Sequence, residues 1–183
     1  MALKNTAESY GSVSKWVHWL AAAMVLAMYL LALAFTNMEE GAAQKSLVTI
    51  HQSVGLIILA VAVFRVLWRR SDPRPPLPDD MPRPERLVAR SVQAFLYLAL
   101  LILPVTGYVF ANAFGDEVSF FGLAMPRLLE KHIPIRNTAW FFHQWTAYLM
   151  LAALALHLGG ALYHHFVRRD AVLKRMLPRG GAD

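Results

Sequence analysis

Four histidines lie inside long apolar segments of this chain, and they are the residues best suited to chemistry. They are His18, His51, His143 and His157. A histidine in hydrocarbon is costly and needs a partner, so an intramembrane histidine marks a functional site by default. Imidazole nitrogens are common metal ligands, which makes a metal-centred redox site the first expectation.

The last two of these histidines are spaced to lie on one face of one helix. His143 and His157 are 14 residues apart. At about 100° and 1.5 Å per residue, this spacing gives four turns less about 40°, and a separation of about 21 Å along the axis. Two metal centres stacked across a bilayer need this arrangement.

The composition is that of a membrane protein. Of 183 residues, 57% are hydrophobic and 16% are charged, which is too apolar for an ordinary soluble domain. The formal charge of +6 is expected of basic residues that flank membrane spans, so no nucleic-acid partner is predicted. The chain has no cysteine, which excludes disulfides, thiolate-bound iron–sulfur clusters and covalently attached c-type haem.

Four apolar runs are long enough to cross a lipid bilayer. They cover roughly residues 15–35, 47–68, 87–110 and 139–167, and each reaches the length of a transmembrane helix. The breaks fall at 39–41, at the proline-rich stretch 69–84 and at 115–137. Only helices satisfy their backbone in lipid at this length without closing a barrel. We therefore predict an all-α integral membrane four-helix bundle, with residues 1–183 forming a single transmembrane domain.

The lysines and arginines predict the orientation of this bundle. Because cytoplasmic loops carry an excess of basic residues, the side with more of them is cytoplasmic. Fourteen lie at the N-terminus, around the second connection or in the C-terminal tail: Lys4, Lys15, Arg65, Arg69, Arg70, Arg74, Arg83, Arg86, Arg90, Arg168, Arg169, Lys174, Arg175 and Arg179. The other two connections hold four, Lys45, Arg127, Lys131 and Arg136. Both termini are therefore predicted to be cytoplasmic.

With this orientation, the four histidines fall at two depths. His18 and His157 lie near the cytoplasmic face, whereas His51 and His143 lie near the outer face. Two facing neutral imidazoles suit a low-spin haem iron, because they fill both axial positions. They suit zinc poorly, because each level lacks third and fourth ligands. The sequence thus predicts the pairs His18/His157 and His51/His143 as axial ligands of two stacked haems.

Glycines near these histidines are predicted to leave room for a flat macrocycle. Gly55 follows His51 by one turn, and Gly159 and Gly160 follow His157. The alternative is that the histidines only pack the helices or sit at the membrane interface. That alternative suits any one of them alone better than it suits four that fall into matched pairs.

Several motifs together resemble the bacterial cytochrome b561 family, in matching order over nearly the whole chain. They are Ser14-Lys15-Trp16-Val17-His18-Trp19, His51-Gln52-Ser53-Val54-Gly55, Arg65-Val66-Leu67-Trp68-Arg69, Leu103-Pro104-Val105-Thr106-Gly107-Tyr108, and the helix with His143, His157 and His164-His165-Phe166. Within the family, the chain is most similar to the short four-helix di-haem form, the superoxide oxidases.

This resemblance implies two b-type haems on His18, His51, His143 and His157, and a place in the bacterial inner membrane. It also implies that superoxide reduces the outer haem and that ubiquinone accepts the electrons. In one respect the chain departs from the family. Members often carry a histidine early in the third span, where this chain has Gln93, which leaves the details of the quinone pocket open.

Quinone reduction consumes protons, so a titratable group is expected near the acceptor. His164 lies two turns beyond His157 on nearly the same face, and we predict it to be a quinone contact or proton donor. Its neighbour His165 is expected to rest at the headgroup level. Arg90 is a further candidate on the quinone side, although its basic charge is also explained by membrane orientation.

Two other functions remain open from the sequence. The chain could be a cytochrome b subunit that relays electrons from a hydrogenase or dehydrogenase partner to quinone. A non-redox membrane protein such as a small transporter would be colourless, and the lack of buried acids in the spans disfavours proton-coupled transport. Charges in the outer connection 115–137 balance, so net charge predicts no steering of an anion to that side.

Overall fold

The computed structural model describes residues 2–178, so Arg179 lies outside the described residues. Four long helices dominate it: α1 (Ser12–Thr36), α2 (Ala42–Ser71), α3 (Arg83–Phe114) and α4 (Ile133–Tyr163). A π-helical turn, η1 (His164–Arg168), continues α4, and a short 3₁₀ turn, η2 (Lys174–Met176), follows. All four long helices are long and apolar enough to cross a membrane. The predicted four-helix membrane bundle is confirmed.

The helices extend beyond the apolar runs at both ends. The non-helical connections are shorter than predicted. The second covers 72–82 instead of 69–84, and the third covers 115–132 instead of 115–137. Helical hydrogen bonds continue into polar residues outside the hydrocarbon, where hydropathy no longer signals them. Pro84 and Pro134 lie in the first turns of α3 and α4, where proline has no helical hydrogen bond to lose. Proline at the second position is therefore compatible with the start of both helices.

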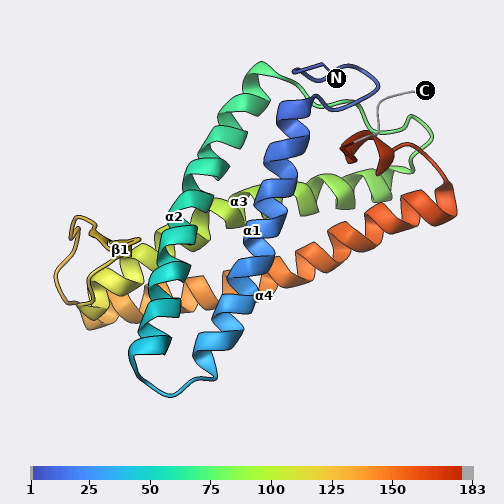
Figure 1. Cartoon of the computed structure of the whole chain (residues 1–183). Coiled ribbons are helices and arrows are strands. Elements are labelled where there is room, and N and C mark those ends of the chain that lie inside the picture. Colours follow the sequence, from blue (N-terminus) through green and yellow to red (C-terminus); the bar gives the residue numbers. More distant parts are fainter. Residues whose placement is uncertain (1, 179–183) are drawn as a thin grey trace.

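The bundle consists of two crossed helical hairpins. Figure 1 shows the antiparallel pair α1 and α2 lying across the antiparallel pair α3 and α4. The two ends of the described chain, residues 2 and 178, lie at one end of the molecule (Figure 1). This end is here called the terminal end and comprises residues 2–11, 72–82 and 169–178. The opposite end, here called the hairpin end, comprises residues 37–41 and 115–132.

The apolar core sits between the two histidine levels. Val25 on α1, Ile58 on α2 and Met150 on α4 are buried in one cluster, and each follows a histidine of its own helix by seven residues. Seven residues are two turns on nearly the same face, so each points inward about 10 Å from its histidine. Ala62, Ala99 and Leu100 complete this cluster.

The outer faces of the helices are apolar and exposed. Leu26, Leu30 and Leu33 on α1 are 62%, 58% and 65% exposed, and their spacing places them on one stripe. An apolar belt of this kind on long helices faces lipid. Inward packing and outward lipid contact therefore use opposite faces of the same helix.

Specific polar contacts close the terminal end. Buried Asp72, just after α2, accepts hydrogen bonds from the Asn5 backbone N–H (3.0 Å) and the Trp68 indole N–H (3.0 Å). The indole of Trp19 donates to the Met176 carbonyl at 2.9 Å. The N-terminal segment is thus held to the end of α2, and the C-terminal segment is held to the first turns of α1.

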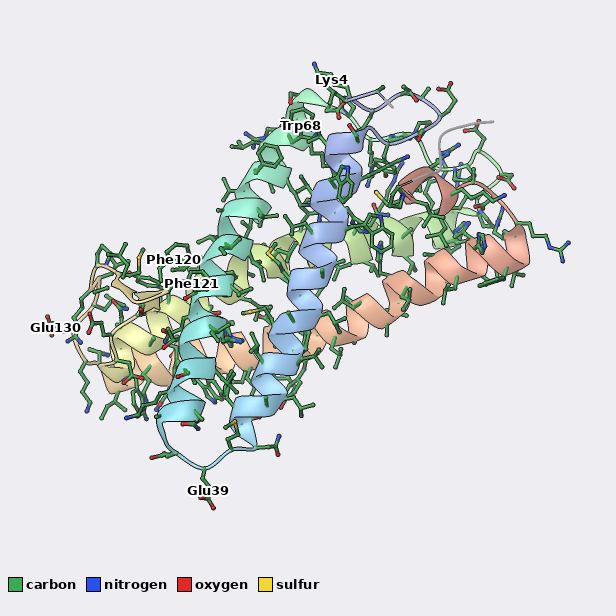
Figure 2. All side chains as sticks on the ribbon, in the orientation of Figure 1. Lys4, Glu39, Trp68, Phe120, Phe121 and Glu130 are labelled. Carbon is green, nitrogen blue, oxygen red and sulfur yellow. The ribbon has the colours of Figure 1, made fainter. Side chains whose placement is uncertain are left out.

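A small β-hairpin, absent from the sequence prediction, packs on α2. Strands β1 (Ser119–Phe120) and β2 (Leu123–Ala124) pair antiparallel across Phe121 and Gly122, whose φ values are +48° and +93°. A bulky residue at positive φ is strained, but the Phe121 N–H donates to the Ser53 hydroxyl at 2.9 Å. That hydroxyl also lies 3.1 Å from the Ser119 carbonyl. Figure 2 shows Phe120 and Phe121 beside α2, far from Lys4 and Trp68 at the terminal end.

Candidate functional site

The structure brings the four histidines together in the two predicted pairs. The ring centres of His18 on α1 and His157 on α4 are 6.2 Å apart, with the ring planes at 62°. Those of His51 on α2 and His143 on α4 are 6.4 Å apart, with the planes at 65°. α4 therefore contributes one histidine to each level, and α1 and α2 each contribute one partner.

This separation suits a metal ion between the rings. Two imidazoles on opposite sides of one metal, each at a bond length of about 2 Å, have ring centres roughly 6 Å apart. Within residues 2–178, no group of three or more metal-ligating side chains forms, so neither level can complete a zinc tetrahedron. Two imidazoles at each level are the donor set for a metal whose other four ligands come from a macrocycle.

The ring of His143 is oriented by α3. Its Nδ1 lies 3.0 Å from the Leu103 carbonyl oxygen and 3.2 Å from the Thr106 hydroxyl. Because a carbonyl only accepts, Nδ1 donates its hydrogen, which leaves the lone pair on Nε2. This is the tautomer that a metal-binding imidazole needs.

Gly107 makes room for this ring. A Cβ at that position would lie 3.1 Å from Cε1 and 3.3 Å from Nδ1 of His143, closer than side chains normally approach. Gly107 is in the Leu103–Tyr108 motif singled out in the sequence. Its lack of a side chain lets α3 and α4 approach at the height of the outer pair.

One ring nitrogen of His51, Nδ1, lacks a hydrogen-bond partner. Its Nδ1 is buried and has no hydrogen-bond partner among the described side chains and backbone, and the Phe35 ring lies edge-on at 5.3 Å. An unpaired buried nitrogen is costly. The neighbouring Gln52 and Ser53 instead hold the β-hairpin, through the Ser119 N–H (3.4 Å) and the Phe121 N–H.

The glycines near the two pairs differ in their surroundings. Gly159 and Gly160 are exposed on α4, and a Cβ at either would meet nothing within 4 Å. Gly55 is buried, and a Cβ there would meet Met28 of α1 at 3.6 Å. Gly55 therefore lies where α1 packs against α2, and the predicted room for a macrocycle beside these glycines stays a prediction.

His164 is buried between two carboxylates that the sequence did not indicate. Its Nε2 lies 3.1 Å from Glu85 Oε1 on α3, and its Nδ1 lies 2.5 Å from Asp170 Oδ2. Arg168 binds Glu85 at 3.2 Å and Asp80 at 2.7 Å. We call these five residues the terminal-end ion cluster. Glu85 and Asp80 are about 80 residues from His164 in the chain, so no local pattern could reveal their contact.

The cluster holds its charges by mutual pairing. Burial raises the pKa of Asp170, but hydrogen bonds from His164 and from the Val172 N–H outweigh it, so that the pKa lies below its ordinary value. On the other side of the ring, Glu85 Oε1 approaches Nε2 without forming a hydrogen bond. The His164 ring is therefore hydrogen-bonded to one carboxylate and in close contact with a second.

The other residues predicted near the quinone lie outside this cluster. Arg90 is exposed on α3. Gln93, one turn further along, accepts a hydrogen bond of 2.7 Å from Arg74. His165 is half-buried, and its Nδ1 has no partner in the part of the chain that the structure describes.

Two facing histidine pairs stacked within four membrane helices define a class of membrane cytochrome. The family model described as prokaryotic cytochrome b561 matches residues 9–179. The chain is 35% identical to cytochrome b561 homolog 2 of Escherichia coli (strain K12), over all of this chain and 98% of that protein. It is 27% identical to the probable superoxide oxidase CybB of Yersinia pestis, over 94% of this chain and 97% of that protein.

The chain belongs to the prokaryotic cytochrome b561 family. It is a multi-pass protein of the bacterial inner membrane and a membrane electron-transfer protein, in a family that binds b-type haem. The resemblance inferred from the motifs is confirmed.

Gly107→Ala should disturb the His143 level. The new methyl group must push the His143 ring by a few tenths of an ångström away from the Leu103 carbonyl. Loss of such an orienting bond weakens metal binding by about tenfold or more. The haem-to-protein ratio and visible spectrum of purified protein measure this. Gly55→Ala is the control, because its methyl group meets only the flexible end of Met28; equal effects in both variants would contradict the assignment.

Proposed function

We propose that this protein is a di-haem superoxide:ubiquinone oxidoreductase. The observation that carries the proposal is the stacking of two facing histidine pairs, 6.2 Å and 6.4 Å between ring centres, at the two levels of one membrane bundle. The similarity to a relative named probable superoxide oxidase supports the choice of donor.

His18 and His157 would hold one haem b through their imidazoles, and His51 and His143 would hold the other. Each haem, when bound, supplies a one-electron iron couple within the membrane. Superoxide gives up one electron at the periplasmic side and leaves as dioxygen. Two such electrons, with two protons, convert one ubiquinone to ubiquinol. The donor reaction needs no acid or base, whereas the acceptor reaction does.

The hairpin end is the periplasmic, superoxide-facing side in this proposal, as the basic residues at the other end predict. Arg127 donates to the Gly115 carbonyl at 3.0 Å, Lys131 lies beside Gly115, and Arg136 lies over the Phe114 ring at 5.6 Å. Among the described residues, none of these three cations lies within 4.0 Å of a carboxylate oxygen. Although net charge gives no steering, this local grouping favours an anionic substrate.

A pulse of superoxide should reduce a low-spin b haem in the purified protein. The reason is that the outer haem accepts the electron directly, without a protein partner. Stopped-flow visible spectroscopy measures the reduction, and superoxide dismutase added beforehand should abolish it. A b-type spectrum unaffected by superoxide would contradict the proposed donor and leave the di-haem arrangement intact.

His51→Ala and His143→Ala should each remove or convert the same haem, and His157→Ala should affect the other one. Each substitution removes one axial ligand at one level only. Redox titration followed at the haem absorption bands resolves the two centres. If His51→Ala perturbed the centre that His157→Ala perturbs, the two-level assignment would be wrong.

Ubiquinone is reduced at the terminal end, near the ion cluster. His164 is the proton donor or quinone contact, and its contacts with Glu85 and Asp170 hold its ring in position. Arg90 lies on the same side of the membrane as a further quinone-side residue. The support is the buried position of His164 between two carboxylates, two turns beyond His157.

His164→Gln should slow the reoxidation of the haems by a soluble ubiquinone analogue by about tenfold or more, because general acid catalysis is lost. The visible spectrum should stay unchanged, since His164 binds no haem. His165→Gln is the matched control at the neighbouring position. Equal reoxidation rates in the two variants would show that His164 takes no part in quinone reduction.

A second candidate is a cytochrome b subunit that passes electrons from a hydrogenase or dehydrogenase to quinone. One observation favours it: Phe121, Leu123 and Leu128 at the hairpin end are 60%, 68% and 68% exposed. Exposed apolar side chains outside the membrane-spanning helices are suited to contact with a partner. Purification in a mild detergent distinguishes the two, because a stable stoichiometric redox partner would favour the subunit.

A further inference from the structure

Arg65 on α2 faces the site between His18 and His157. It follows His51 by 14 residues, the same spacing that separates His143 from His157 on α4. It therefore lies on nearly the same α2 face as His51, about 21 Å further along the axis. Its Nη2 is 3.5 Å from Nδ1 of His18. Three helices thus meet at this level, two through histidines and α2 through arginine.

The surroundings of Arg65 are cationic. Its guanidinium lies 5.0 Å from the centre of the Tyr97 ring on α3, and the guanidinium of Arg69 lies 5.3 Å from the same ring. Like charges four residues apart on a helix repel each other. Within residues 2–178, neither arginine has a carboxylate oxygen within 4.0 Å. The nearby acid Asp72 is engaged by Asn5 and Trp68.

The hydrogen-bond donors around His18 also need an acceptor, and an anion would supply one. When His18 binds iron through Nε2, its Nδ1 carries hydrogen and is a donor. The arginine Nη2 is a donor too, so the two groups at 3.5 Å need an acceptor near both. The Tyr97 hydroxyl, 3.5 Å from Arg65, can donate to the same acceptor. A cation inside a membrane span without a counter-charge is costly.

We propose that Arg65 binds a propionate carboxylate of the haem held by His18 and His157, with Arg69 and Tyr97 supporting it. Arginine matches the two oxygens of a carboxylate with paired hydrogen bonds. The inference rests on the haem placement proposed above and adds the residue that fixes the orientation and potential of that haem. A phospholipid phosphate offers the same anionic oxygens, and the test separates the two sources.

The test is a redox titration of both haems in Arg65→Gln, Arg65→Lys and Arg70→Gln. It is carried out in a nonionic sugar detergent free of phosphate. Loss of a cation beside the iron favours the oxidised form of the haem. Arg65→Gln should therefore lower the equilibrium constant for reduction of the His18/His157 haem at least tenfold, which lowers its midpoint potential by about 59 mV for one electron. Arg65→Lys should fall between this variant and the original protein. Arg70 is exposed and is the second-last residue of α2, so Arg70→Gln should change neither haem.

Several results would overturn the inference: Arg65→Gln matching Arg70→Gln, a shift confined to the His51/His143 haem, or a shift that appears only when anionic phospholipid is added back. If Arg65→Gln does not fold, Arg65→Lys is compared with Arg70→Lys. A lowered potential or weakened haem retention at the His18/His157 level alone supports the inference, and identical titrations refute it. If His157→Ala removes no haem, the haem placement itself fails, independently of the role of Arg65.

Discussion

An imidazole inside a bilayer must have a partner, and most of this structure follows from that constraint. The four intramembrane histidines do not bond to one another, and they face each other in pairs at just over 6 Å. One helix, α4, supplies a histidine to both levels, so the positions of α1 and α2 are set relative to it. Tyr29 on α1 donates to the Ala147 carbonyl of α4 at 2.7 Å, between the two levels. Apart from this bond, the apolar cluster around Val25, Ile58 and Met150 fills the space between the levels.

The two histidine pairs have different surroundings. At the level near the hairpin end, neutral groups orient the rings: the Leu103 carbonyl for His143, and the Phe35 edge beside His51. The level near the terminal end is open along α4 and bordered by the guanidinium of Arg65. The terminal-end ion cluster lies beyond it. This asymmetry fits the proposed reaction, in which the donor side needs no proton transfer and the acceptor side does.

Much of the architecture could be predicted because its signals are local. Span number follows from the length of apolar runs, and the shared face of His143 and His157 follows from helical periodicity. Helix ends were misplaced by several residues, because hydropathy stops at the membrane surface and helical hydrogen bonds do not. The β-hairpin was missed because Phe121 occupies a left-handed position usually taken by asparagine or glycine. The hydrogen bond from the Phe121 N–H to Ser53, on another element, helps to hold that position.

The sequence by itself determined four spans, the two depths of the histidines and the family, because each depends on residue type and spacing along one helix. Tertiary structure alone decided that Gly55 packs against Met28 while Gly159 faces open space. It alone placed His164 between Glu85 and Asp170, and Arg65 beside His18. Such contacts join residues tens of positions apart on different helices. Their distances depend on how the two hairpins cross, which periodicity within a single helix does not specify.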